Sequence, residues 1–251
     1  KGDYLIVLDS DCILPPDYIK SVNKELQETG ADAFGGPDKA SDSFTDVQKA
    51  INYSMTSFFT TGGIRGGKKK MDKFYPRSFN MGIRKSTYEA LNGFSAMRFG
   101  EDIDFSIRLF KNGYKVCLFP SAWVYHKRRT DWRKFFRQVY NSGIARINLY
   151  KKYPDSLKLV HLLPAIFTLG VLFFLIGSIF CAWSLLPLGL FCLLIFADST
   201  IQNKSIKIGF LSIIASFIQL LGYGCGFLDA TWNRLILKKE EFSAFQKTFY
   251  K

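Results

Sequence analysis

Two carboxylates stand close together in the segment Asp9-Ser10-Asp11, directly after the apolar run Tyr4–Leu8. A carboxylate pair in such a loop can hold a divalent cation, and the cation can in turn bind phosphate oxygens. A polar turn that simply ends a strand would have the same sequence. Taken alone, the pair is therefore a weak indication of a metal site.

A second group of acids is Gly100-Glu101-Asp102-Ile103-Asp104, at the expected start of a helix. Acidic residues at this position often cap the helix or interact with its dipole. A catalytic role requires one carboxylate to remain available as a general base near the metal. Both interpretations are open from this segment by itself.

His126 is one of two histidines, and it is followed at once by Lys127, Arg128 and Arg129. An imidazole and several cations in one loop suit a metal ligand beside a site that binds an anion. The alternative is a basic patch next to a membrane. The segment 75–81 is less specific, although its polar groups could line a pocket for sugar hydroxyls; the candidates there are Arg77, Ser78, Asn80 and Met81.

The elements that must position these residues follow from local patterns. The continuous apolar run Tyr4–Leu8 predicts a central parallel strand covered on both faces, with Asp9 at the sheet edge where ligands bind. Residues 60–72 are rich in glycine and lysine and are expected to form a mobile loop. Helices are expected at 17–29, 46–59, 86–91 (capped by Ser86), 101–111 and 132–150 (capped by Asp131), and strands at 31–34, 78–84, 114–119 and 122–125.

From Leu159 onward the chain is strongly apolar, with stretches at 159–183, 185–197 and 208–228. The first and third are long enough for membrane helices, whereas the second is short and ends at Asp198. Flanking residues could extend the second to a tilted or interfacial span. We expect a partial catalytic domain at 1–157, two to three transmembrane helices within 158–231 and a juxtamembrane tail at 232–251.

Basic residues are concentrated between Lys127 and Lys152, immediately before the first apolar stretch, which indicates a cytoplasmic side for the soluble part. By the same rule, a third full span would leave Arg234, Lys238 and Lys239 on the unfavoured side. Either the second stretch does not span, or the third lies in the membrane interface.

The net charge of +13 raises the possibility of nucleic-acid binding, but the basic cluster adjoins an apolar stretch and no nucleic-acid motif is present. The five cysteines include no C-x-x-C pair, so neither a disulfide framework nor a zinc site is expected.

Together, these motifs resemble family 2 glycosyltransferases of the GT-A fold, a Rossmann-like α/β core, over residues 1 to about 150. Each motif is short, and the resemblance rests on their order and spacing. They are Asp9-Ser-Asp, Arg77-Ser-Phe-Asn-Met-Gly-Ile, Gly93-Phe94, Gly100-Glu-Asp-Ile-Asp and His126-Lys-Arg-Arg.

The resemblance implies an inverting transfer from a nucleotide-diphospho-sugar, usually a UDP-sugar, with Mn²⁺ or Mg²⁺ as cofactor. Asp11 would bind the metal, and Asp9 would contact the metal or the donor. Asp102 would be the base, Glu101 would shape the acceptor site, and His126 would reach the metal or diphosphate. The leaving diphosphate would be neutralised by Arg128 and Arg129.

Two departures from the family pattern matter. The Gln-x-x-Arg-Trp motif of processive members is missing, since Gln138 is followed by Val139-Tyr140-Asn141-Ser142. We therefore expect transfer of one sugar to a glycan or polyprenyl-linked acceptor. The family's first nucleotide-binding strand is also missing, so we expect an N-terminally truncated member.

The expected location is the cytoplasmic (inner) membrane, as a multi-pass protein with its catalytic domain facing the cytoplasm. Two alternatives remain, namely a processive polysaccharide synthase and a catalytically dead membrane scaffold of the same fold.

Overall fold

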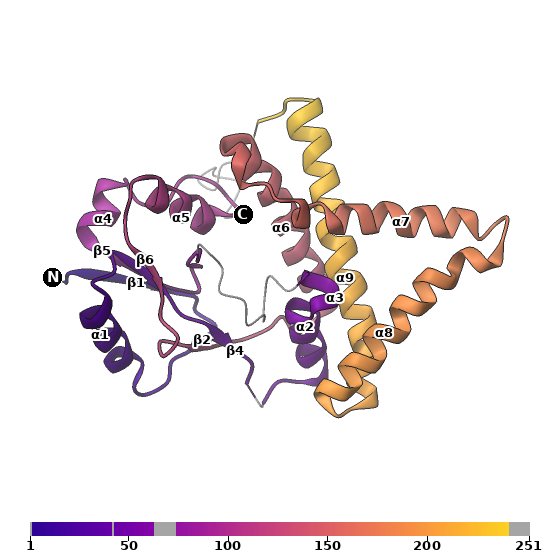
Figure 1. Cartoon of the computed structure of the whole chain (residues 1–251), viewed down its shortest axis with the longest axis horizontal. Helices are drawn as coiled ribbons and strands as arrows, with labels where there is room; N and C mark the ends of the chain where they lie inside the picture. Colours follow the sequence, from indigo (N-terminus) through magenta and orange to yellow (C-terminus); the bar gives the residue numbers. More distant parts are fainter. Residues whose placement is uncertain (1, 42, 63–73, 241–251) are drawn as a thin grey trace. The chain divides into compact units, whose positions relative to one another are not determined.

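The computed structural model describes residues 2–41, 43–62 and 74–240 (Figure 1). The chain divides into two compact units. Of the described residues, the sheet unit comprises 2–41 and 74–127, and the helical unit comprises 43–62 and 128–240. The division thus places two segments of the expected catalytic domain, 43–62 and 128–157, with the apolar helices; the boundary at 157 stays a prediction.

The sheet unit contains two sheets, and the mixed α/β fold predicted from the sequence is confirmed. The larger sheet has the order β1-β5-β3-β6, in which only β3 and β6 are parallel. Its strands are β1 (Tyr4–Leu8), β5 (Asn80–Arg84), β3 (Ala33–Gly35) and β6 (Val116–Leu118). The smaller sheet has the order β2-β7-β4, formed by β2 (Cys12–Ile13), β7 (Val124–His126) and β4 (Asp38–Lys39).

Strand β1 differs from its prediction. It lies at the edge of the larger sheet in the described part of the chain and pairs antiparallel with β5, from Tyr4 opposite Arg84 to Leu8 opposite Asn80. Leu5 and Ile6 are exposed. The expected central parallel strand is therefore wrong, because a continuous apolar run reveals neither the direction nor the number of its neighbours.

Helices cover both faces of the larger sheet (Figure 1). On one face, α1 (Tyr18–Thr29) packs against Phe34 and Phe119. On the other face, α5 (Glu101–Lys111) packs against Met81 and Ile83, beside α4 (Lys85–Ala90). Helix α4 begins at Lys85, so the predicted cap at Ser86 is wrong.

The helical unit contains six α-helices among its described residues. The expected helix 46–59 is interrupted at Ser57, whose extended backbone ends one helix and begins the next. Asp131 caps its helix by accepting a bond from the Lys134 amide, as predicted. The helices are α2 (Asp46–Thr56), α3 (Phe58–Thr61), α6 (Trp132–Lys152), α7 (Leu163–Gly177), α8 (Leu186–Asn203) and α9 (Ile206–Ala230).

Helix α9 is the centre of the helical unit, and α2, α6, α7 and α8 all contact it. Its side chains Ile208 and Ala215 are buried against Ile51 of α2 and Phe135 of α6. A Cβ atom at Gly226 would overlap the backbone of Tyr140, so this glycine allows α6 and α9 to approach closely. Helices α7 and α8 form a hairpin that projects from α9 (Figure 1).

Two helical segments are long and apolar enough to cross a membrane, Ala182–Asn203 and Ile206–Ile236. The expectation of a full-length membrane helix in the first apolar stretch is therefore wrong, whereas the second stretch is extended by flanking residues, as the sequence allowed. The first stretch holds only the 15-residue helix α7, which is about 22 Å long. The second is extended by polar residues up to Asn203. A bilayer core is about 30 Å thick, so α7 alone is too short to span it.

Candidate active site

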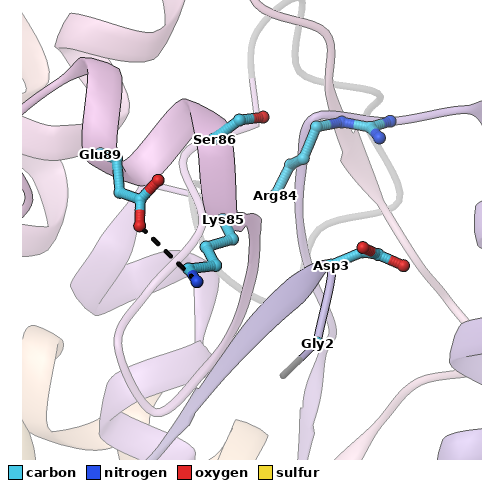
Figure 2. A pocket seen from close by; sticks show the side chains of 6 residues that line it. All are labelled: Gly2, Asp3, Arg84, Lys85, Ser86 and Glu89. Atoms are coloured by element: carbon cyan, nitrogen blue, oxygen red, sulfur yellow. Dashed lines mark ion pairs between the residues drawn. The ribbon is translucent and has the colours of Figure 1, made fainter.

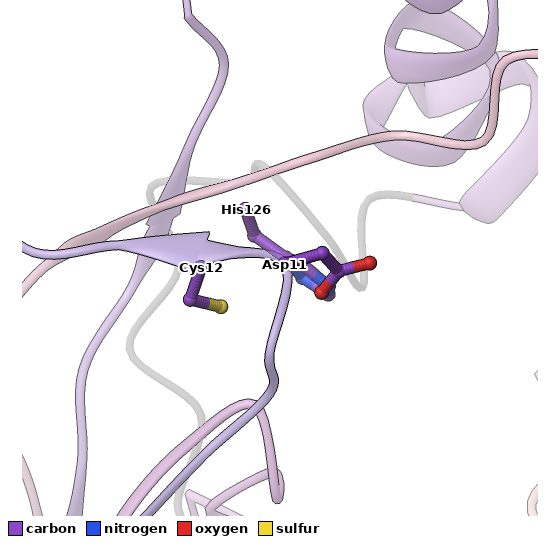
Figure 3. A group of neighbouring side chains, drawn as sticks. All are labelled: Asp11, Cys12 and His126. Carbon is purple, nitrogen blue, oxygen red and sulfur yellow. The ribbon is translucent and has the colours of Figure 1, made fainter.

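The acidic loop and His126 are brought together by the pairing of two short strands. After β1, the Cys12 amide donates to the carbonyl of Asp9 (3.1 Å), and β2 follows. Cys12 pairs with His126 of β7, so the imidazole lies beside the carboxylate of Asp11 (Figure 3). His126 Nε2 is 3.3 Å from Asp11 Oδ1 and 3.7 Å from Asp9 Oδ2. The predicted association of Asp9, Asp11 and His126 is therefore present in the geometry.

Two further residues belong to this group, although sequence reasoning missed both as site residues. Cys12 lies within ligand distance of Asp11 and His126 (Figure 3), and its thiol donates to the carbonyl of Phe79 (3.5 Å). Burial raises the pKa of Cys12 to about 11, and the charges of Asp9 and Asp11 add to the shift. The ring of Phe79 stacks on His126 with centroids 4.9 Å apart.

Residues 77–79 connect this group to the second acidic segment. Arg77 Nε is 2.8 Å from Asp102 Oδ2, and the amide of Ser78 donates to the same oxygen (3.4 Å). Phe79 contacts Cys12 and His126 on the other side. One short segment before β5 therefore touches both constellations that the sequence placed far apart.

The acids at the start of α5 are partly withdrawn from water. Asp102 is only 6% exposed, and its Oδ1 accepts a bond from the amide of Ile103 (2.7 Å). Burial raises the pKa of Glu101, and the neighbouring charge of Asp102 raises it further. Asp9 contributes a smaller effect of the same sign, which indicates that the two acidic segments influence each other electrostatically.

Asn80 and Met81, predicted to contact the acceptor, are buried side chains of β5. The amide of Asn80 accepts a bond from the Tyr18 hydroxyl (2.6 Å) and donates to the carbonyl of Ala122 (2.7 Å). Met81 packs into the core beneath α5. Both side chains support the strand in this structure, whereas Arg77 and Ser78 lie at the bridging segment; their acceptor contacts stay a prediction.

Arg128 and Arg129, predicted to bind the diphosphate, belong to the helical unit. Arg128 is buried, and its Nε donates to Asn52 Oδ1 (3.1 Å). Its backbone carbonyl accepts a bond from Gln48 Nε2 (2.9 Å). Helix α2 thus fixes Arg128, a role for Asn52 and Gln48 that no sequence signal indicated. The predicted loop 60–72 lies largely outside the described residues.

A cavity of about 480 Å³ lies at the opposite end of β1 and β5, lined by Gly2, Asp3, Arg84, Lys85, Ser86 and Glu89 (Figure 2). The strand register separates it from the candidate site, because Tyr4 pairs with Arg84 at the cavity end and Leu8 pairs with Asn80 at the acidic end. An ion pair between Lys85 and Glu89 (3.8 Å) lies at its wall. The cavity is therefore separate from the acidic loop.

The donor atoms at the acidic loop fit a hard or borderline divalent cation. Two carboxylates and an imidazole are ligands that suit Mn²⁺, and carboxylates suit Mg²⁺. Cys12 lies in the same group, but its raised pKa disfavours the thiolate form that binds metals. Asp9, Asp11 and His126 are therefore the residues that would hold such an ion.

The structure has an α/β domain in which an acidic loop follows strand β1 and a second acidic segment begins helix α5. Residues 4–197 match the family described as glycosyl transferase family group 2. The chain therefore belongs to this family of glycosyltransferases, which generally use a divalent metal.

Curated relatives carry names of the same kind. The chain is 23% identical to the succinoglycan biosynthesis protein ExoA of Rhizobium meliloti over 65% of this chain and 49% of that protein. It is 25% identical to a probable glycosyltransferase of Sulfolobus acidocaldarius over 46% of this chain and 25% of that protein. It is 32% identical to the probable glycosyltransferase YdaM of Bacillus subtilis over 28% of this chain and 16% of that protein. The chain thus spans half or less of these relatives.

Proposed function

We propose that the complete protein transfers one sugar from a nucleotide-diphospho-sugar, a UDP-sugar, to a lipid-linked or other envelope-glycan acceptor, with inversion at the anomeric carbon. The observation that carries this proposal is the segment 77–79, which touches both Asp102 and the Asp11–His126 group. Family membership supports the reaction class. The name of the R. meliloti relative supports a polysaccharide context for the acceptor.

The proposed chemistry is a single displacement. The acceptor oxygen forms a bond to the anomeric carbon while the bond from that carbon to the diphosphate breaks. Asp102 takes the acceptor proton, and Arg77 holds the carboxylate in place through its 2.8 Å contact. Glu101 borders the acceptor. Arg128 and Arg129 supply positive charge for the leaving diphosphate, the kind of electrostatic stabilisation that usually dominates.

A bound Mn²⁺ or Mg²⁺ would add Lewis-acid stabilisation of the diphosphate oxygens. Asp9, Asp11 and His126 would hold it, with Phe79 stacked on the imidazole to fix the ring plane. The test is the thermal stability of the complete protein with and without Mn²⁺ and UDP. Binding to the folded state should raise the melting temperature.

Asp11→Asn should remove most of the Mn²⁺-dependent rise and most of the sugar transfer. Asp3→Asn is a matched control, since Asp3 is also an acid of the sheet unit but lies beside the cavity at the opposite end of β1. An Asp11→Asn protein that keeps both metal response and transfer would contradict the site.

We also propose that the hairpin of α7 and α8 enters the cytoplasmic membrane, with the catalytic part facing the cytoplasm. Large apolar side chains are exposed along both helices, and the tip residues Ile179, Phe180 and Trp183 are each more than three-quarters exposed. Such a surface is costly in water. Helix α9 instead packs on α2 and α6, which favours an interfacial position for it.

Membrane attachment has its own test. Phe180→Asp with Trp183→Asp should release the protein from washed membranes, whereas Trp123→Asp in the sheet unit should not. Retention of the double variant on the membrane would contradict insertion of the hairpin tip.

The length of the product separates the proposal from its closest alternative. A single-sugar transferase yields acceptors extended by one unit, whereas a processive synthase yields long chains. A scaffold would bind donor and metal with no transfer in the same assay.

A further inference from the structure

A cluster of three basic residues lies in the helical unit, outside the residues proposed for sugar transfer. Arg146 is on α6, and Lys158 and His161 lie in the segment between α6 and α7. Apolar contacts hold these elements together, since Ile147 of α6 and Ala165 of α7 share one buried cluster. The side chains that flank the basic residues, Ile144, Leu157 and Leu162, pack against the same cluster.

Arg146 has an unusual environment for a cation. Its Nε atom is buried and has no hydrogen-bond partner within the described residues. A buried donor without an acceptor is costly, and more so when it carries charge. The described residues thus leave this guanidinium without a complete set of acceptors, which makes it a candidate for binding an anion.

His161 presents a second donor at the same place. Its Nδ1 accepts a bond from the amide of Lys158 (3.0 Å), so the proton of the neutral ring is on Nε2. Burial lowers the pKa of His161 to about 3, and the charges of Arg146 and Lys158 add to the effect. Arg146 and Lys158 therefore lie near enough to the ring to act on it electrostatically.

The cluster also lies at a defined depth if the hairpin enters a bilayer. It stands at the base of α7, where the chain passes from the charged end of α6 to apolar residues. Leu159 is 83% exposed and Ile166 is 59% exposed, so lipid chains can reach the helix directly beside the basic groups. Polar groups at the start of an inserted helix lie at the level of the lipid headgroups.

We propose that Arg146, Lys158 and His161 bind the phosphate headgroup of a membrane lipid. The phosphate oxygens would accept from the half-exposed Arg146 guanidinium and from His161 Nε2, and the exposed Lys158 ammonium would add charge. The adjacent surface of α7 would hold the acyl chains. Free phosphate offers the same oxygens but not the apolar contact. This site is independent of the transfer reaction, and its failure would leave the proposed reaction untouched.

The two histidines of the chain make the site directly observable. We suggest ¹⁵N-histidine spectra of the chain in maltoside micelles, with His161→Gln to assign the signals. Dioctanoyl phosphatidic acid should shift the His161 signals and raise the pKa of this ring, because an anion favours the charged imidazolium. Dioctanoylglycerol, which lacks only the phosphate, should not.

Arg146→Gln should weaken phosphatidic acid binding about tenfold or more, as expected for loss of a charge-assisted bond. Arg137→Gln makes the same charge change at an exposed position of α6 and should have no effect. If Arg146→Gln fails to fold, the exposed Lys158→Gln should still reduce the affinity. Unchanged binding in both variants, or an equal response to dioctanoylglycerol, would overturn the site. An equal response to inorganic phosphate at the same concentration would overturn the assignment to a lipid.

Discussion

Helix α5 carries two buried carboxylates with opposite expected roles. Asp102 and Asp104 are each paired with an arginine, at 2.8 Å to Arg77 and 3.0 Å to Arg108. Asp102 adjoins the segment 77–79, which also contacts the proposed metal ligand His126. Asp104 is fully buried and faces away from that segment into the Arg108 pair. Replacing each with asparagine separates catalysis from stability.

For Asp102→Asn we expect kcat to fall about 10²- to 10⁴-fold, the usual contribution of a general base. The asparagine oxygen can still accept from the Ile103 amide. The side chain of Arg77 is 38% exposed, so its charge can be hydrated after the pair is lost. The free energy of unfolding should therefore fall by only about 1–2 kcal/mol, less than for a fully buried pair.

For Asp104→Asn the expected order is reversed. The side chain of Arg108 is 20% exposed and keeps its bonds to the carbonyls of Leu91 (2.6 Å) and Gly93 (2.7 Å). Loss of its carboxylate partner should cost about 2–3 kcal/mol, slightly less than the full cost of breaking a buried pair. Transfer by the protein that remains folded should be nearly unchanged.

The assay is transfer from a radiolabelled nucleotide-sugar by the complete protein in membranes, with urea unfolding measured on the same preparations. Near wild-type turnover in Asp102→Asn would refute its role as base. An equal loss of turnover in folded Asp104→Asn would show that any perturbation of α5 disables the enzyme. In that case the comparison would no longer support a specific role for Asp102.

Two further predictions concern stability. Glu101→Gln should raise the melting temperature, measured by calorimetry in a metal chelator, near neutral pH but not near pH 4. The reason is that burial raises the pKa of Glu101 in the folded state. The stability contributed by its protonated form is therefore lost as pH rises above the ordinary value of about 4.3. Gly226→Ala should destabilise by about 1–3 kcal/mol in chemical unfolding because its Cβ would overlap the Tyr140 backbone, whereas Gly189→Ala, with open space around it, should not destabilise.

Features set by local chemistry could be predicted from the sequence. Gly30 ends α1 and Gly113 follows α5, both with the left-handed backbone that glycine adopts most easily. Asp131 caps α6 as expected. Each of these signals depends on a few neighbouring residues and one hydrogen bond. These helix ends were therefore accessible from the sequence, whereas the start of α4 and the break at Ser57 were not.

The partners within the candidate site depend instead on strand pairing between distant segments. Cys12 and Phe79 carry no signal of their own, yet the β2–β7 register places Cys12 opposite His126, and the β1–β5 register brings residues 77–79 to the acidic loop. A shift of either register by one residue would turn these side chains to the other face. The sequence could name the acids and the histidine, but not the residues that join them.

The same reasoning limits what apolar composition can say about the membrane. Segments Ala182–Asn203 and Ile206–Ile236 have nearly equal hydropathy, 1.9 and 1.8, but 11% and 44% of their windows are buried. The second is apolar largely because α2 and α6 cover it, and the first is apolar with little protein around it. Composition indicates how unfavourable it is to expose the surface of a helix to water. Only the packing shows whether protein covers that surface. In this chain, α9 is covered largely by α2 and α6, whereas the exposed apolar surface of the α7–α8 hairpin is the part on which the proposal of membrane insertion rests.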